Sequence, residues 1–323
     1  MNNNKGIKSK LSFSICLPIY KGSDILRNCL NSIVSQTFDN FEIIIGDDNT
    51  PGEDDAEIKN MEKILDEYND SRIKYVKNEK NIGYALNLMN IVKYAKNDVL
   101  FLAAQDDIFS KDSLKLTHDA LLIDENVGCV TRPYFWFDEE TKRPIRAVLP
   151  PDINSPKIMN IQNKEDFNKI FESVGQLSGL AYIREFIEEP FNDECFPAHI
   201  YPFASILRNH KCVFLNEYTV AVGINNSQTR KISSIYDISP TESWINMYKK
   251  VFENQKYKKQ LTFGINHICK EHLGLFQIKN FAKPGLLFRE IKFLVKYRPL
   301  NIFSVKFLII VVVTSLIPRV ILI

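Results

Sequence analysis

The 323-residue sequence lacks the features that point to a nucleic-acid partner, a disulfide framework or a zinc site. Its net charge is only +2, from 41 Lys and Arg against 39 Asp and Glu residues, and the basic residues are spread along the chain. We expect no nucleic-acid partner, because proteins that bind one carry a basic surface. The six cysteines form no CxxC pair and no zinc-like spacing, so we interpret them as reduced, buried thiols.

The sequence also shows no repeat or low-complexity tract, and its start has no leader-like pattern. The first six residues, MNNNKG, contain no apolar stretch, so we expect no secretory signal. No internal repeat is present. The hydrophobic fraction of 45%, with 25% charged residues, is typical of a globular protein. The length allows one large domain or two ordinary ones.

The C-terminal end is almost entirely apolar from residue 302 to 323. Its uncharged run, 307–318, is shorter than the roughly 20 residues that cross a bilayer. The run fits either a buried terminal helix or a segment lying in the membrane interface beside the basic stretch 289–298. We favour the second interpretation and predict a membrane-associating tail over 301–323.

The first 132 residues alternate between strand and helix patterns. The expected strands are 13–20, 41–46, 72–77, 98–104 and 127–132. Helices are expected between them, at 25–34 with Ser23-Asp24 as its cap, 54–69, 82–96, and 110–124 with Ser110 as its cap. This alternation predicts parallel pairing with right-handed crossovers. The fold class is therefore α/β, with a mostly parallel, doubly wound sheet.

The alternation stops after residue 132. Residues 133–175 are predicted to be an irregular excursion, with helical character only near 167–173. A helix over 201–209 and a strand over 212–215 follow, and the strand precedes the stretch 218–223. Residues 240–298 have amphipathic helical patterns, so we predict a helical C-terminal extension.

Polar clusters follow three of the expected strands. Tyr20 follows the first, Asp48 the second and Gln105-Asp106-Asp107 the fourth. An Asp-Asp pair alone fits a simple turn equally well, because Asp side chains bond nearby backbone amides. The carboxyl ends of parallel strands meet at one sheet edge, where ligands bind in such folds. Two acidic clusters at that edge repel each other unless a cation or ligand offsets their charge.

These residue types suit a particular chemistry. A diphosphate attached to a sugar leaves readily only when its charge is neutralised, and a divalent cation held by carboxylates does this. Asp106 and Asp107 fit such a ligand pair for Mn²⁺ or Mg²⁺, and Asp48 fits an acceptor for a base or ribose group. The cluster therefore predicts binding of a nucleotide-sugar donor and transfer of its sugar to an acceptor hydroxyl.

Two stretches carry a family resemblance: FSICLPIYKGSDILRNCLNSIVSQTFDNFEIIIGDDNT and NEKNIGYALNLMNIVKYAKNDVLFLAAQDDIF. Over roughly residues 12–132 the chain resembles the family 2 glycosyltransferases, which have the GT-A fold. The resemblance implies that Pro18 and Tyr20 lie against the nucleotide base and that Asp48 binds it. It implies that Asn81-Ile82-Gly83, with Asn87, flanks the ribose and diphosphate, although Gly83 also fits a simple turn with positive φ. Asp106 and Asp107 are the implied metal ligands, Asp107 being the stronger candidate.

The resemblance also implies inversion at the anomeric carbon, which needs a base for the acceptor hydroxyl. Relatives carry an acidic pair before a helix where this chain has CFPAHIYP. His199 aligns near that position, and its ordinary pKa suits a base. Asp193 and Glu194 lie just upstream and are equal alternatives, since a lone histidine is more often structural. The loop 176–179 resembles an acceptor-contacting loop.

The resulting organisation has four parts: a donor half over 1–132, an acceptor half over 133–230, a helical extension over 231–300 and the apolar tail. The resemblance implies polysaccharide biosynthesis, with a glycan or lipid-linked glycan acceptor at the cytoplasmic face of the inner membrane. A Rossmann dehydrogenase is disfavoured, because the turn after the first strand, YKGS, has one glycine. The remaining alternative is a membrane-associated, non-catalytic protein that binds nucleotide or metal, or a scaffold.

Overall fold

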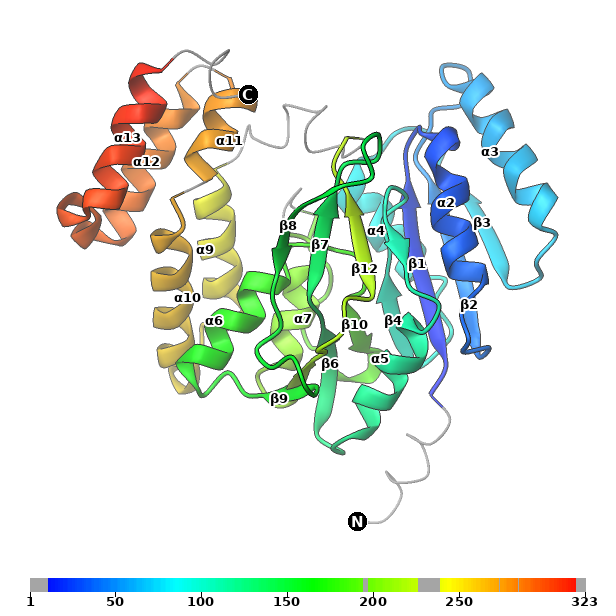
Figure 1. The fold of residues 1–323 in the computed structure, drawn as a ribbon, viewed down its shortest axis with the longest axis horizontal. Coiled ribbons are helices and arrows are strands. Elements are labelled where there is room, and N and C mark those ends of the chain that lie inside the picture. The colour runs from blue at the N-terminus through cyan, green and yellow to red at the C-terminus, as the bar shows by residue number, and fades with distance from the viewer. Residues whose placement is uncertain (1–10, 194–196, 226–238, 273, 284, 318–323) are drawn as a thin grey trace. The chain divides into compact units, whose positions relative to one another are not determined.

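The computed structural model describes residues 11–193, 197–225, 239–272, 274–283 and 285–317 (Figure 1). The chain divides into two compact units. Met1–Ile161 with Lys169–Asn226 form the first, and Gln162–Asn168 with Ser227–Ile323 form the second. Both β-sheets belong to the first unit, whereas the described elements of the second are helices.

An eight-stranded sheet forms the centre of the first unit, in the order β3-β2-β1-β4-β10-β6-β11-β9. The bounds are β1 Phe13–Ile19, β2 Phe41–Asp47, β3 Ile73–Lys77, β4 Val99–Leu102, β6 Val127–Thr131, β9 Lys157–Met159, β10 Ala181–Ile183 and β11 Lys211–Phe214. Neighbours pair in parallel except where β10 lies between β4 and β6 and where β9 pairs with β11. The predicted mostly parallel, doubly wound sheet is confirmed.

The order of the strands creates a switch point between β1 and β4. The chain moves from β1 to β2 and β3 on one side, then returns to place β4 on the other side of β1. The side chains of β1, β2 and β4 are almost all buried, as expected where both faces of a sheet are covered. In such sheets ligands bind beyond the carboxyl ends of the strands, at the switch point.

The helices of this unit are α2 Ser23–Val34, α3 Asp55–Tyr68, α4 Tyr84–Val92, α5 Ser113–Leu122 and α7 Ile200–Ile206, with the 3₁₀ turn η1 Arg184–Phe186. α6, Lys164–Ser173, contributes residues to both units. α2 packs on α3, whereas α4 packs on β1 and β2. Right-handed crossovers that change direction after β3 put α2 and α4 on opposite faces of the sheet (Figure 1).

Two predicted helix caps are wrong. The N-cap of α2 is Gly22, and the Ser23 hydroxyl instead donates to Glu57 Oε2 at 3.1 Å. The N-cap of α5 is Asp112, because residues 108–109 form a strand just before it and delay the helix past Ser110.

A second, four-stranded sheet has the order β5-β12-β7-β8. Its bounds are β5 Ile108–Phe109, β7 Tyr134–Phe137, β8 Pro144–Val148 and β12 Val220–Gly223. The prediction of an irregular excursion over 133–175 is therefore wrong, since this range contains β7, β8 and β9. β8 is exposed along most of its length, so its sequence has no alternation that would indicate a half-buried strand.

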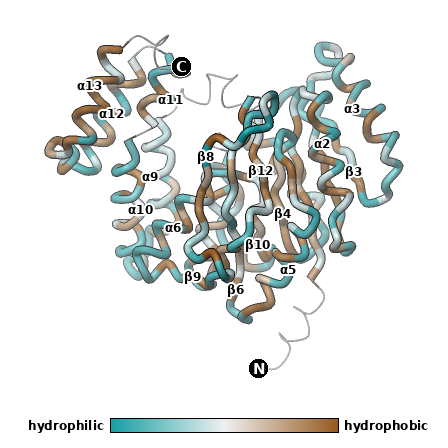
Figure 2. The backbone as a smooth tube through the Cα atoms, in the orientation of Figure 1, coloured by the Kyte–Doolittle hydropathy of each residue, from teal (hydrophilic) through white to brown (hydrophobic). Residues whose placement is uncertain are grey.

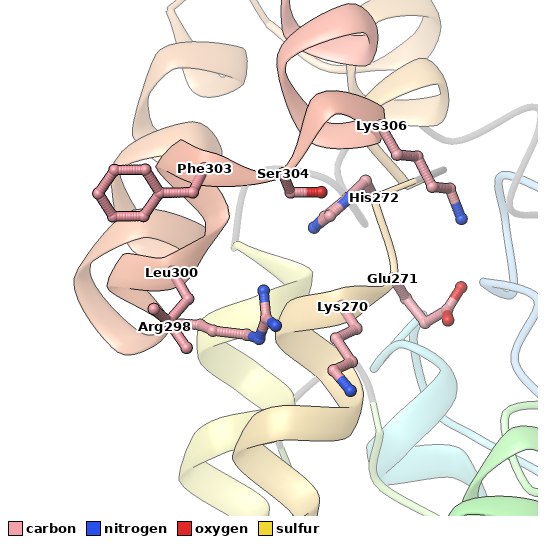
Figure 3. A pocket seen from close by; sticks show the side chains of 8 residues that line it. All are labelled: Lys270, Glu271, His272, Arg298, Leu300, Phe303, Ser304 and Lys306. Carbon is pink, nitrogen blue, oxygen red and sulfur yellow. The ribbon is translucent and has the colours of Figure 1, made fainter.

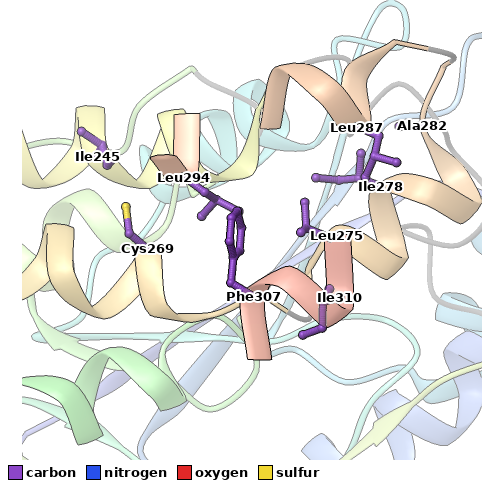
Figure 4. Close-up of a cluster of buried hydrophobic side chains, with 9 residues drawn as sticks. All are labelled: Ile245, Cys269, Leu275, Ile278, Ala282, Leu287, Leu294, Phe307 and Ile310. Atoms are coloured by element: carbon purple, nitrogen blue, oxygen red, sulfur yellow. The ribbon is translucent and has the colours of Figure 1, made fainter. Parts of the chain in front are cut away.

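The second unit is built from α9 Pro240–Val251, η3 Gln255–Tyr257, α10 Lys258–Lys270, α11 Gly274–Phe281, α12 Leu286–Tyr297, η4 Pro299–Phe303 and α13 Val305–Leu316. The predicted helical extension is confirmed. Its core gathers nine buried side chains: Ile245, Cys269, Leu275, Ile278, Ala282, Leu287, Leu294, Phe307 and Ile310 (Figure 4). Buried Glu290 accepts hydrogen bonds from the Ser239 hydroxyl and, at 3.0 Å, from Thr241 N–H, which fixes the start of α9.

Two smaller expectations can be compared with the structure. Cys16, Cys29, Cys129, Cys212 and Cys269 are buried and unpaired, as predicted for reduced thiols, whereas Cys195 lies outside the described residues. Among the helices that the structure describes, none has both the length and the apolar character needed to span a membrane.

Candidate active site

Gln105 joins the two loops that border the switch point. Its Oε1 accepts a hydrogen bond from Tyr20 N–H at 2.9 Å, and its Nε2 donates to the Lys21 carbonyl oxygen at 2.6 Å. Gly22 lies against this amide with φ of 76°, and a Cβ added there would be 2.6 Å from Gln105 Nε2. The ends of β1 and β4 are therefore held together by one buried side chain, and the position beside it favours glycine.

Asp48 fastens the turn before α4 to the end of β2. Its carboxylate accepts hydrogen bonds from Asn78 Nδ2 at 2.9 Å, Ile82 N–H at 2.8 Å and Gly83 N–H at 2.8 Å. Gly83 has φ of 85°, which favours glycine, and it is the N-cap of α4. Asp48 is 2% exposed, so these three donors occupy much of its accepting capacity in the described chain. Asn81, in the same turn, is exposed.

Asn87 holds α4 against β2. Its Nδ2 donates to the Gly46 carbonyl oxygen at 2.8 Å, and its Oδ1 accepts from Asn78 Nδ2 at 3.1 Å. A Cβ added to Gly46 would lie 2.5 Å from Asn87 Oδ1, so the close packing of helix on strand requires this glycine. The structure thus brings Asn87 and Asp48 together through Asn78, as parts of one buried polar network.

Pro18 and Tyr20 lie at the end of β1. Pro18 is half-buried and pairs with Gly46 across the sheet, and Tyr20 is also half-buried. The Lys21 ammonium lies 5.2 Å from the Tyr20 ring centroid and 3.3 Å from Asp54 Oδ1. The side chains predicted to contact the base therefore share one edge of the sheet with Asp48.

Asp106 and Asp107 differ sharply in their surroundings. Asp107 is 1% exposed, and its carboxylate accepts hydrogen bonds from Gln176 Nε2 at 2.6 Å and Gly223 N–H at 3.1 Å. Burial raises the pKa of Asp107, and the charge of Asp106 raises it further. Asp106 is half-buried. Asp107 thus ties β4 to β12 and to the 176–179 loop, while Asp106 has the more accessible carboxylate.

The Asp106-Asp107 pair suits a divalent cation that takes only one or two of its ligands from the protein. No group of three or more His, Cys, Asp or Glu side chains that could hold a metal occurs in the described part of the chain. A cation of the Mg²⁺ type needs only one or two carboxylates when substrate phosphates and water supply its other ligands. Two adjacent carboxylates, one of them with its pKa raised by burial and by its neighbour, fit that arrangement.

The 176–179 loop lies beside this pair. Besides the bond from Gln176 to Asp107, the Ser178 hydroxyl oxygen accepts from Ala104 N–H at 2.9 Å, and Gly179 N–H donates to Leu102 at 2.8 Å. The loop therefore follows the end of β4. Contact of this loop with an acceptor stays a prediction.

Arg132 is a buried cation that the sequence did not single out. It is 1% exposed, and its guanidinium donates to the hydroxyls of Ser113 at 2.8 Å, Thr117 at 2.7 Å and Thr219 at 2.7 Å. Burial lowers the pKa of Arg132 to about 9. A Cβ added to Gly179, where φ is 84°, would lie 2.6 Å from its side chain. Its partners come from positions 113 to 219, so no local signal could have revealed it.

His199 is buried and its two ring nitrogens face hydrogen-bonding groups. Nδ1 lies 3.0 Å from the Tyr84 hydroxyl, and Nε2 lies 3.1 Å from the Val174 carbonyl oxygen. Since a carbonyl only accepts, Nε2 carries the proton of the neutral ring and Nδ1 accepts from Tyr84. Burial lowers the pKa of His199 to about 4, so the ring is neutral at pH 7.

The two other candidate bases lie just before α7. Asp193 is exposed, and Glu194 lies outside the described residues. On the described side of this segment, Asn192 N–H donates to the Ala198 carbonyl oxygen at 3.5 Å. Asp193 precedes His199 by six positions, and the His199 partner Tyr84 opens α4 next to the 81–83 turn.

Residues 14–186 match the model of Glycosyl transferase family 2, which is more than half of the chain. The chain belongs to this family. The matched range includes the switch-point loops, the 81–83 turn and the Asp106-Asp107 pair, so the family assignment rests on the region where these predicted residues converge. The family inferred from the two sequence stretches is confirmed.

Curated relatives of this family 2 chain match part of its length. It is 29% identical over 109 residues to the UDP-Glc:alpha-D-GlcNAc-diphosphoundecaprenol beta-1,3-glucosyltransferase WfgD of Escherichia coli, covering 34% of this chain and 40% of WfgD. It is 28% identical over 129 residues to glycosyltransferase GlyG of Streptococcus pneumoniae, covering 39% of this chain and 40% of GlyG. The chain thus spans about two fifths of the length of these relatives.

Solved structures share the fold across most of the chain. S. aureus TarS 1–349 aligns with a TM-score of 0.64 at 14% identity, over 90% of this chain and 81% of TarS 1–349. Mannosyltransferase PcManGT of Pyrobaculum calidifontis, in complex with GDP-Man and Mn²⁺, aligns with a TM-score of 0.54 at 14% identity, over 95% and 87%. These likenesses confirm the predicted GT-A fold.

Proposed function

We propose that the chain transfers a sugar from a nucleotide-sugar to an acceptor hydroxyl, using a divalent metal. The observation that carries this proposal is the convergence of Asp106, Asp107, the 81–83 turn and the Tyr20 loop at the switch point. The family supports it, and so do the ligands of structures that share the fold. TarS is described with UDP and UDP-GlcNAc, and PcManGT with GDP-Man and Mn²⁺.

Asp106 would be the first ligand of the metal, with Asp107 behind it. This reverses the order expected from the sequence, because Asp107 is buried and already accepts two hydrogen bonds from the protein. The bound cation would neutralise the charge of the leaving nucleoside diphosphate. Asp107 would hold β4, the 176–179 loop and β12 so that Asp106 faces the diphosphate.

Asp48 and Gln105 would shape the donor site. Asp48 fixes the 81–83 turn, and Gln105 fixes the Tyr20 loop, so the base and ribose would meet two preorganised loops. Tyr20 and Pro18 would pack on the base. Asp48 could also bind the base directly, but only through accepting positions of its carboxylate that do not already bind the 81–83 turn.

Transfer would proceed with inversion, and the base would be a carboxylate before α7. His199 is disfavoured as the base because it is buried and both of its ring nitrogens already face protein groups, the Tyr84 hydroxyl and the Val174 carbonyl oxygen. It would act as a positioning residue that holds Tyr84 beside the donor turn. Asp193 is the exposed candidate that the structure describes, and Glu194 is its neighbour in sequence.

The acceptor would be a glycan or lipid-linked glycan of polysaccharide biosynthesis, used at the cytoplasmic face of the inner membrane. WfgD, whose name gives a diphosphoundecaprenol-linked acceptor, supports a lipid-linked substrate. The apolar C-terminal helix supports association with the membrane surface.

Donor screening tests the function. UDP-, GDP-, CDP- and dTDP-sugars would be titrated with and without Mn²⁺ while thermal unfolding is followed. A donor at 100 times its Kd should stabilise the chain by about 2.7 kcal/mol. No stabilisation by any of these donors, with wild-type behaviour of Asp106→Ala, would contradict the transferase assignment. Binding without release of nucleoside diphosphate or sugar transfer would favour the non-catalytic alternative.

The base is tested by turnover with the identified donor. Asp193→Ala and Glu194→Ala would be compared with His199→Ala in donor affinity and in kcat. We expect one carboxylate variant to keep donor affinity and lose turnover. Inversion is checked by the anomeric configuration of the product, and a retained configuration would sink the inverting mechanism.

A further inference from the structure

The outer side of the last helix is apolar and bare in the second unit. α13 is hydrophobic on nearly all sides, which is typical of a helix that is fully covered. Its inner side chains, Phe307 and Ile310, pack in the core of the unit (Figure 4). The opposite side and the preceding η4 expose large side chains, which we name the apolar ridge: Leu300, Ile302, Phe303, Val305, Leu308, Ile309, Val312 and Leu316. Figure 2 shows the strongly hydrophobic colour of α13.

The basic residues are spread along the chain, but the acidic residues are concentrated outside the C-terminal helices. Residues 239–317 carry 13 Lys and Arg against four Asp and Glu, a net charge of +9, whereas the rest of the chain carries 28 against 35. One of the four acids, Glu290, is buried in hydrogen bonds at the start of α9. A basic unit with a bare apolar ridge complements an anionic lipid surface better than it complements neutral lipid.

A cavity of about 490 Å³ lies between the end of α10 and the start of α13 (Figure 3). It is lined by Lys270, Glu271, His272, Arg298, Leu300, Phe303, Ser304 and Lys306. Three of these side chains are cations and one is an anion. Among the residues that the structure describes, Lys270, Arg298 and Lys306 form no ion pair. Two ridge residues, Leu300 and Phe303, form part of its wall, so the cavity opens beside the ridge.

One of the lining residues, His272, also has a buried ring nitrogen for which the described residues supply no hydrogen-bond partner. His272 is 3% exposed, and its Nε2 lies 3.1 Å from the Cys269 carbonyl oxygen. Its Nδ1 has no hydrogen-bond partner within the described residues. Because Nε2 donates to the carbonyl, Nδ1 of the neutral ring is an acceptor. The Ser304 hydroxyl oxygen caps α13 by accepting from Phe307 N–H at 3.3 Å, which leaves its O–H able to donate.

These groups fit a phosphate that carries a hydroxylated substituent. Lys270, Arg298, Lys306 and the Ser304 hydroxyl supply donors and positive charge for phosphate oxygens. His272 Nδ1 supplies an acceptor for a hydroxyl of the substituent. A glycerol phosphate group has both the phosphate oxygens and the hydroxyl, and it is small enough for this volume.

We propose that this cavity binds the phosphoglycerol head group of an anionic membrane lipid while the apolar ridge lies among the lipid acyl chains. The inference deepens the proposed association with the membrane and rests on it. It is independent of the donor site, because all the residues involved belong to the second unit. The cations would meet the phosphate layer at the depth at which Phe303 and Leu300 reach apolar surroundings.

Vesicle sedimentation of the full chain tests the proposal. Vesicles of phosphatidylcholine alone and with one-third phosphatidylglycerol would be compared at 0.15 M salt. The pocket variant is Arg298→Gln with Lys306→Gln. The control, Lys258→Gln with Lys259→Gln, removes the same charge from exposed positions of α10 outside the cavity. We expect phosphatidylglycerol to raise wild-type binding at least tenfold, the pocket variant to lose roughly tenfold and the control less than threefold.

Further arms identify the occupant. Equal losses in the pocket and control variants would overturn the proposal, because diffuse charge would then explain binding. Soluble glycerol phosphate could instead stabilise the wild type but not the pocket variant against thermal unfolding. If the wild type then also showed no preference for anionic vesicles, the cavity would be reassigned to a soluble phosphate. Phe303→Ser should weaken vesicle binding, and a change in oligomeric state instead would make the ridge an interface between copies.

Donor binding separates this inference from the proposed function. Circular dichroism and thermal unfolding would establish that each variant folds. In the absence of vesicles, the pocket variant should bind a nucleotide-sugar with Mn²⁺ as the wild type does. Loss of lipid preference with intact donor binding would confirm the cavity as the lipid site. Intact lipid preference in a chain that binds no donor would remove only the transferase function.

Discussion

The side-chain amide of Gln105 donates a hydrogen bond to the carbonyl oxygen of Lys21 across the switch point, at 2.6 Å. Lys21 has φ of 54°, a conformation that a residue with a side chain adopts at a cost, so the bond holds the Tyr20 loop in an otherwise unfavourable shape. A carboxylate at position 105 could not make this bond, because it has no donor.

Replacing Gln105 by Glu should therefore loosen the donor site. The buried hydrogen bond would be lost, and the new carboxylate would face the Lys21 carbonyl oxygen, which is also an acceptor. Together these effects should lower the free energy of unfolding by about 1–3 kcal/mol. Donor affinity with Mn²⁺ should fall as well. Gln36→Glu is a matched control, because buried Gln36 also joins two segments, donating to the carbonyls of Ser32 and Ser110 at 2.9 and 2.7 Å. Urea unfolding and donor titration should show similar destabilisation of both variants, but weaker binding only in Gln105→Glu. If Gln105→Glu bound the donor as tightly as Gln36→Glu does, Gln105 would not be what shapes the donor site.

The two carboxylates of the Asp106-Asp107 pair should respond differently to substitution. Asp106→Asn should leave the melting temperature nearly unchanged and weaken Mn²⁺-dependent donor binding at least tenfold, because a half-exposed metal ligand is lost. Asp107→Ala should lower the unfolding free energy by about 2–4 kcal/mol, because it leaves Gln176 and Gly223 without their shared acceptor. Calorimetry of donor binding and thermal unfolding would measure both. Normal binding by Asp106→Asn would reject it as the first ligand.

His199 should make stability depend on pH below neutrality. Burial lowers its pKa from 6.5 to about 4, so between these values the unfolded chain binds a proton that the folded chain does not. Its contribution to stability is therefore complete above pH 6.5 and is lost as pH falls towards 4. A shift of that size corresponds to roughly 3 kcal/mol.

His199→Gln tests this dependence, since the amide can keep both hydrogen bonds without titrating in this range. The variant should lose less stability than the wild type when urea unfolding is compared at pH 7 and pH 4.5. Retained turnover at pH 7 would agree with a positioning role for His199. Identical slopes of stability against pH in the two proteins would show that another group titrates.

The parts of the fold that follow local patterns were predictable. β1 and β2 are buried on both faces and so appear as continuous apolar runs, and the Asp106-Asp107 pair follows β4 directly. β10 has only three residues, all buried, and its place between β4 and β6 depends on antiparallel pairing with distant strands. No period can be detected in so short a segment.

The same distinction applies to the site. Asp48 and His199 were identified by residue type and position, but their surroundings depend on side chains and backbone groups far along the chain. Asp48 meets the backbone of residue 82, and His199 meets Tyr84, 115 positions earlier. Burial and hydrogen bonding of this kind determine whether a polar residue binds a ligand or holds a loop, and a single sequence does not contain that information.

Arg132 should prove a strong structural determinant in spite of its charge. It reaches three hydroxyls on α5 and beside β12, and its guanidinium lies 5.1 Å from the Phe101 ring centroid. Lysine has one compact ammonium and cannot span these positions as the planar guanidinium does. Arg132→Lys should therefore lower the unfolding free energy by about 2–4 kcal/mol, since hydrogen bonds to charged groups contribute about 1.5–3 kcal/mol each.

Arg146→Lys is the matched control for this substitution. Arg146 is exposed and stacks over Trp136 at 3.9 Å from its ring centroid, so its replacement should cost less than about 1 kcal/mol. Urea unfolding of both variants measures the difference. Equal, small losses would mean that the buried guanidinium is replaced by water or by a shift of α5, whereas a large loss confined to Arg132→Lys would establish it as the tie between β6, α5 and the second sheet.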